Sequence, residues 1–123
     1  MSSIICTAWG NSLLSTYFSP SVTLYVALFS ASPGLGASIA NEIAGGSYAR
    51  QATTFSTPSS KTSSNNSILS FPNMPACSIT HIGLCTTLTG STLFTFADIP
   101  GAPVSVPNSA EVRYEVGDYA VSF

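Results

Sequence analysis

The sequence predicts a mainly β, antiparallel domain of about seven strands, arranged as a β-sandwich or jelly roll, with one short N-terminal helix. Short segments rich in β-branched and aromatic residues recur roughly every 8–12 residues, and Gly, Pro and Ser separate them. Helical periodicity occurs only near the N-terminus, which excludes the alternating strands and helices of βαβ units. At 123 residues, the chain is expected to form a single β-sandwich domain, residues 1–123.

The predicted helix covers about residues 3–18. Ser2 or Ser3 can cap it, and Ser19-Pro20 ends it, because a residue before proline avoids the α region. Apolar residues recur at helical spacing along one face. They are Ile5, Trp9, Leu13 and Tyr17, with Leu14 and Phe18 beside them.

Residues 22–29 form a continuous apolar run, which predicts a central strand buried on both faces. Residues 30–46 are dense in Gly, Pro, Ser and Asn and predict a long loop. Further strand signals, each bounded by turn residues, occur at residues 48–55, 68–71, 79–85, 93–97, 112–116 and 119–123.

The C-terminal segment alternates apolar residues with the charged Glu111, Arg113 and Glu115, so one face of a strand is polar. Gly117-Asp118 predicts a hairpin turn into the last strand. Residues 56–67 are polar and low in complexity, which predicts a loop that is either mobile or held by a neighbour.

Charge is the unusual feature of the composition. Asp, Glu, Lys and Arg make up 7% of the residues, against about 25% in an ordinary domain, while 45% are hydrophobic. Such a chain is expected to be a subunit of a larger assembly. Three scattered basic residues exclude a phosphate-binding footprint, so no nucleic acid is expected as a partner.

No membrane partner is expected either, because the longest apolar stretch, residues 22–31, falls short of the roughly 20 residues that span a bilayer. The first residues lack the pattern of a secretory signal, which predicts a protein made and kept inside a cell until it is released by other means. Cys6, Cys77 and Cys85 are accordingly expected to be reduced thiols.

Cys77, His81 and Cys85 have the side chains of metal ligands at even spacing. Positions four apart in a strand are about 13 Å from each other, too far for one zinc ion unless a bulge intervenes. We therefore expect no metal and no cofactor, with two small apolar cysteines flanking a hydrogen-bonded histidine.

No catalytic residues are predicted, and the chain is expected not to be an enzyme. Gly45-Gly46-Ser47 approximates a nucleophile elbow, but its glycines precede a strand instead of following one. Glu111 and Glu115 could share a face, but Arg113 lies between them and a salt-bridged surface ladder accounts for all three.

Arg50 stands in an otherwise uncharged segment, and its nearest candidate partner is Glu42. Two interpretations stay open. Arg50 is either an edge charge that discourages aggregation or one half of an ion pair that pins the loop at residues 30–46 against the sheet.

Several blocks of the sequence resemble a family of small tailed-phage virion proteins, described as head decoration, cement or tail-fibre-like proteins. The most specific block is NEIAGGSYARQATTF (residues 41–55). The others are the N-terminal helix, TLYVALFSASPG (residues 23–34), NSILSFP (residues 66–72), ITHIGLCTTLTGSTLFTFA (residues 79–97) and a closing turn and hairpin at residues 106–123.

The resemblance implies a non-enzymatic structural protein of the virion, assembled in the host cytoplasm. Its main implication is a decoration or cement protein that binds the shell of the major capsid protein and other virion proteins, forms a homo-oligomer in the particle and stabilises the head. The alternative is a tail-fibre or baseplate component that binds a host surface glycan, with Trp9, Tyr48 and Asn65 or Asn66 as its candidate contacts. The predicted interaction residues are Glu42, Arg50, Tyr48 and Trp9.

Overall fold

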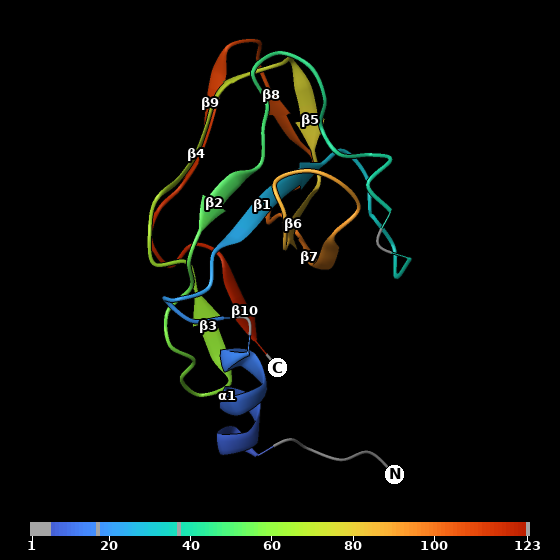
Figure 1. The fold of residues 1–123 in the computed structure, drawn as a ribbon. Helices are drawn as coiled ribbons and strands as arrows, with labels where there is room; N and C mark the ends of the chain where they lie inside the picture. The colour runs from blue at the N-terminus through green and yellow to red at the C-terminus, as the bar shows by residue number, and fades with distance from the viewer. Residues whose placement is uncertain (1–5, 17, 37, 123) are drawn as a thin grey trace. The chain divides into compact units, whose positions relative to one another are not determined.

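The computed structural model is mainly β, with antiparallel pairing and one short helix, which confirms the predicted fold class (Figure 1). It describes residues 6–16, 18–36 and 38–122. Within these ranges ten strands occur instead of about seven. In chain order the elements are α1 Thr7–Ser15, β1 Leu24–Phe29, β2 Gln51–Thr53, β3 Thr62–Ser64, β4 Leu69–Met74, β5 Cys77–Ile79, β6 His81–Cys85, β7 Leu93–Asp98, β8 Val104–Val106, β9 Ala110–Tyr114 and β10 Ala120–Ser122.

The strands make one four-stranded sheet, in the order β2-β1-β6-β7, and three two-stranded sheets, β10-β3, β4-β9 and β5-β8. The predicted central strand is β1, which has a neighbour on each side and five buried residues of six. It pairs with β6 in antiparallel register, with Val26 opposite Leu84 and Leu28 opposite Ile82. Continuous burial explains the uninterrupted apolar run in the sequence.

Gly83 of β6 is needed for close packing in this sheet. A Cβ at this position would lie 2.6 Å from Cδ1 of Leu93 and 3.0 Å from Cε2 of Phe29. Phe29 and Leu93 are both buried, and they form a core cluster with Ala27 and Cys85. The missing side chain therefore leaves room for Phe29 of β1 and Leu93 of β7 to pack over the backbone of β6.

Contacts divide the chain into two compact units. One unit combines the N-terminal segment up to Thr23 with Thr53–Leu69 and the C-terminal segment from Tyr114. The other comprises Leu24–Ala52 and Ser70–Arg113, and it contains the core cluster of β1, β6 and β7.

The core of the first unit is aromatic. Phe55 is fully buried, and its ring makes edge contacts with Phe18, at a centroid distance of 5.1 Å, and with Tyr119, at 5.8 Å. Such edge-to-face pairs add to the gain from burial alone. In the same unit, the Lys61 N–H donates to Oδ1 of Asn11 at 2.8 Å, which ties α1 to the turn before β3.

Helix α1 is shorter than predicted. The helix ends at Ser15. Phe18 therefore lies beyond the helix, and its ring packs against Phe55 instead of extending the helical face. Trp9 and Leu13 of the predicted apolar face are exposed. The proposed caps Ser2 and Ser3, and the face residues Ile5 and Tyr17, lie outside the described residues, as does Phe123 at the end of the last predicted strand.

The predicted C-terminal hairpin is wrong. Strand β9 pairs with β4, and β10 pairs with β3, with Val121 opposite Ser63. The polar segment at residues 56–67 is thus partly a strand, held by a neighbour. Its composition hides this because two of its buried residues, Ser63 and Asn65, are polar and satisfied by hydrogen bonds.

The alternation predicted at the C-terminal end is present in β9. Glu111 and Arg113 are exposed, whereas Val112 and Tyr114 are partly buried. The predicted strand at residues 79–85 divides at Thr80 into β5 and β6. There the backbone changes partner, because β5 pairs with β8 while β6 pairs with β1 and β7.

Candidate functional site

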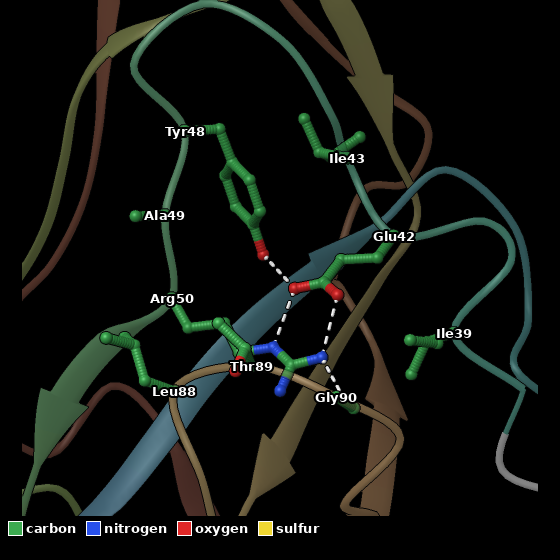
Figure 2. A pocket seen from close by; sticks show the side chains of 9 residues that line it. All are labelled: Ile39, Glu42, Ile43, Tyr48, Ala49, Arg50, Leu88, Thr89 and Gly90. Carbon is green, nitrogen blue, oxygen red and sulfur yellow. Dashed lines mark hydrogen bonds and ion pairs between the residues drawn. The ribbon is translucent and has the colours of Figure 1, made fainter.

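Three of the four predicted interaction residues meet at one place in the second unit. Glu42 ends the long loop that follows β1, where the Ile43 N–H donates to the Leu28 carbonyl at 3.0 Å. Tyr48 and Arg50 lie in the segment just before β2 and point toward the Glu42 carboxylate (Figure 2). We call these three side chains the Glu42 network.

The predicted ion pair between Arg50 and Glu42 is present and bidentate. Nη2 of Arg50 lies 2.8 Å from Oε1 of Glu42, and Nε lies 2.9 Å from Oε2. Only 4% of the Arg50 side chain and 15% of the Glu42 side chain are exposed. The hydrogen bonds to Glu42 raise the pKa of Arg50 above its ordinary value. Of the two interpretations, an exposed edge charge is wrong and the pinning ion pair is correct.

Arg50 also holds the connection between β6 and β7. Its Nη1 donates to the Thr87 carbonyl at 3.1 Å, and its Nη2 donates to the Gly90 carbonyl at 2.7 Å. Gly90 has a φ of +92°, a conformation that favours glycine. The sequence gives no signal for these contacts, because backbone carbonyls 37 and 40 residues away can be placed only by the fold.

Tyr48 joins the Glu42 network to the sheet. Its hydroxyl donates to Oε2 of Glu42 at 2.7 Å and accepts from the Leu28 N–H at 3.1 Å. Its ring stacks on Phe71, at a centroid distance of 6.1 Å. Burial is the main reason why the pKa of Tyr48 is raised well above its ordinary value. The Glu42 carboxylate thus links the loop to the segment before β2, and the Tyr48 hydroxyl extends this link to strand β1.

A hollow of about 350 Å³ lies beside this network. Ile39, Ile43 and Leu88 surround it with apolar side chains, and the ion pair contributes to its wall (Figure 2). Across the described part of the chain, no buried side-chain nitrogen or oxygen lacks a hydrogen-bond partner. The side chains of Glu42, Tyr48 and Arg50 in the wall are therefore already satisfied, by each other and by backbone groups.

Trp9, the fourth predicted interaction residue, lies on α1 in the other unit and is 73% exposed. Asn65, one of the suggested glycan contacts, is only 1% exposed. Its side chain bonds the carbonyls of Ser67 and Glu115 and the Tyr119 N–H, so no polar group of Asn65 remains for a sugar. Asn66 is exposed.

The three residues with metal-ligand side chains are placed differently. His81 has both ring nitrogens engaged, with Nδ1 2.7 Å from Oγ1 of Thr80 and Nε2 2.7 Å from Oδ1 of Asp98. Cys85 is buried and Cys77 partly buried, and both are free thiols. Burial raises the pKa of each. Among the residues described, no group of three or more His, Cys, Asp or Glu side chains could hold a metal ion.

The two motifs that resemble catalytic sites also have structural roles. Gly45, with a φ of +95°, and Gly46, with a φ of +56°, form the turn that carries the exposed Ser47. The Tyr48 N–H closes this turn by donating to the Gly45 carbonyl at 3.3 Å. Glu111 is exposed on β9 and accepts a hydrogen bond from the Ser70 hydroxyl.

No helix in the described ranges has the length and apolar character needed to cross a membrane.

Comparison with known proteins supplies the family. Residues 1–122 match the model of the family described as podophage GP4 fiber I protein gp80. No curated protein and no solved structure matches the chain. The match covers nearly the whole sequence and confirms the resemblance to tailed-phage virion proteins. This chain is a structural virion protein and belongs to the podophage GP4 fiber I protein gp80 family.

Proposed function

We propose that this protein is a component of a tail fibre, the alternative that the sequence left open beside head decoration. The observation that carries the proposal is the family match, which extends over residues 1–122 and names a fibre protein. That match favours a fibre over a cement protein on the capsid shell. The proposed partners are other tail proteins and further copies of the same chain.

The composition of the surface supports a role inside an assembly. The chain has only three basic and five acidic residues and a net charge of −2, which gives little repulsion between copies. Several large apolar side chains are also exposed, as expected of a surface that other subunits cover. They are Trp9, Leu13, Leu35, Ile68, Leu88 and Val116.

Binding of a host surface glycan is the finer part of the proposal, and Trp9 is the residue best placed for it. Its indole is exposed, and aromatic faces are the usual platforms for apolar sugar faces. Tyr48 and Asn65 are unsuited, because their polar groups are engaged within the protein. A Trp9→Ala variant should lose binding to host surface polysaccharide, whereas a variant of the exposed Val116 to Ala should not.

Antibodies against the purified chain test the location. Gold-labelled antibodies should bind intact particles at the tail and should reduce adsorption of the phage to its host. Label distributed regularly over the head would support the decoration protein instead. Label that appears only after particles are disrupted would exclude an exposed fibre.

A further inference from the structure

The hollow beside the Glu42 network has the properties of a site for an apolar side chain. Its apolar lining comes from the loop after β1, through Ile39 and Ile43, and from the β6–β7 connection, through Leu88. The carboxylate and guanidinium in its wall are bonded to each other, to Tyr48 and to backbone carbonyls. A sugar would find no unpartnered buried donor or acceptor here, so an apolar occupant fits better.

The same unit carries an apolar side chain that has no packing of its own. Leu35 has a relative exposure of 102%, the highest among the exposed large apolar residues of the described chain. It lies between Gly34 and Gly36, and a Cβ built on either glycine would have no neighbour within 4 Å. Leu35 therefore stands on an exposed turn, the tip, within the loop that follows β1, with open space at both flanking glycines.

The loop that presents Leu35 has a fixed base. The Ser30 N–H donates to the Asn41 carbonyl at 2.9 Å, and Phe29 and Glu42 form an isolated antiparallel bridge. The ion pair of Glu42 with Arg50 holds the returning end of the loop. An anchored base reduces the conformational entropy that the tip would lose when it binds.

Charge does not oppose contact between the tip and the hollow. Residues 30–41 contain no Asp, Glu, Lys or Arg, and the two charges in the wall of the hollow neutralise each other. Two copies of the chain can therefore approach through these surfaces without like-charge repulsion.

We propose that Leu35 of one copy inserts into the hollow of a second copy, among Ile39, Ile43 and Leu88. The tip and the hollow are different surfaces, so the contact is heterologous and each copy both gives a tip and receives one. Repetition of such a contact produces a closed ring or a filament. The proposal rests on the surfaces of this chain and not on its location in the virion, so it can fail while the fibre proposal stands.

Disulfide trapping between two variants tests the contact directly. In a Cys6→Ser background, which removes the exposed native thiol, a Leu35→Cys chain is mixed with a Leu88→Cys chain under mild oxidation. The control replaces the Leu88→Cys chain with a Ser105→Cys chain, since Ser105 is an exposed residue of β8 outside the hollow. The mixed dimer of Leu35→Cys with Leu88→Cys should form roughly tenfold faster than the mixed dimer of Leu35→Cys with Ser105→Cys. Equal rates for the two mixtures would overturn the proposal.

Sedimentation velocity provides an independent test without cysteines. The parent protein should self-associate, and Leu35→Asp should weaken the association roughly tenfold or more, because an ionised side chain cannot enter an apolar hollow. Leu35→Met keeps an apolar side chain of similar size and should associate as the parent does. Ile68→Asp changes an exposed residue of the other unit and should have little effect. A parent that stays monomeric at high concentration, or a Leu35→Asp variant that associates normally, would contradict the contact.

Discussion

Removing Arg50 should destabilise the protein mainly through the carboxylate that it leaves behind. In an Arg50→Met variant, the apolar part of the side chain is largely kept, but Glu42 loses both of its bonds to the guanidinium. Glu42 retains one donor, the Tyr48 hydroxyl, and its side chain is only 15% exposed. Removing one partner of a buried ion pair costs about 3–5 kcal/mol.

We expect about 3 kcal/mol, the lower end of that range, because the partial exposure of Glu42 lets water reach the carboxylate. The carbonyls of Thr87 and Gly90 also lose their donor, but both residues are exposed and water can replace it. The Arg50→Met, Glu42→Gln double variant should be less destabilised than Arg50→Met alone. Glutamine carries no charge and can still accept the hydrogen bond from Tyr48.

Urea unfolding followed by circular dichroism measures these free energies, and hydrogen exchange of residues 38–46 reports the loop. The exposed Arg113 of β9 provides the control, since Arg113→Met should cost less than about 1 kcal/mol. The reasoning is refuted if Arg50→Met costs no more than Arg113→Met. It is equally refuted if the double variant loses the sum of the two single losses.

Three further predictions concern Asn65, the ionisation of Tyr48 and the reactivity of the cysteines. Asn65→Ala should lower the free energy of unfolding by about 3 kcal/mol, because the buried N–H of Tyr119 and two carbonyls lose their partner. The control is Asn66→Ala at an exposed position, which should cost about 0.5 kcal/mol. Equal losses in the two variants would argue against a structural role of the Asn65 side chain. The pKa of Tyr48 is raised in the folded state, so the unfolded chain loses that proton first and stability should fall as pH rises above the ordinary value of 10.0. Urea unfolding between about pH 9 and 11 should show a smaller loss for Tyr48→Phe than for the parent, and the same loss in both would contradict the assignment. Finally, a thiol reagent should modify the exposed Cys6 first and Cys85 last, because burial shields Cys85 and raises its pKa. Labelling of Cys85 at the rate of Cys6 would contradict this prediction and would show that the core of β1, β6 and β7 opens readily.

Local sequence patterns predicted the elements whose burial is apolar. The run at residues 22–29 identified β1, and the alternation around Glu111 and Arg113 identified the exposed face of β9. Patterns failed where burial is polar. Strand β3 contains the buried Ser63 and is followed by the buried Asn65, so its composition is that of a loop.

The Glu42 network was predicted only in part, because only its charged residues leave a signal in the sequence. A lone guanidinium near a lone carboxylate suggested the ion pair, and nothing else in the neighbourhood could neutralise Arg50. The carbonyls of Thr87 and Gly90 carry no side-chain signal, so their contacts with Arg50 follow only from the fold. The final pairing of β10 with β3 was missed because a turn sequence shows where the chain bends but not which strand it then meets.

A density map of the intact particle tests most directly whether this chain is a fibre component. The four-stranded sheet of β2, β1, β6 and β7, with the loop that carries Leu35, provides the shape to be fitted. We expect the sheet to fit density in a fibre attached to the tail, in a small number of copies that contact one another. Density for the sheet in a regular array on the head shell, and none in the tail, would contradict the proposed function.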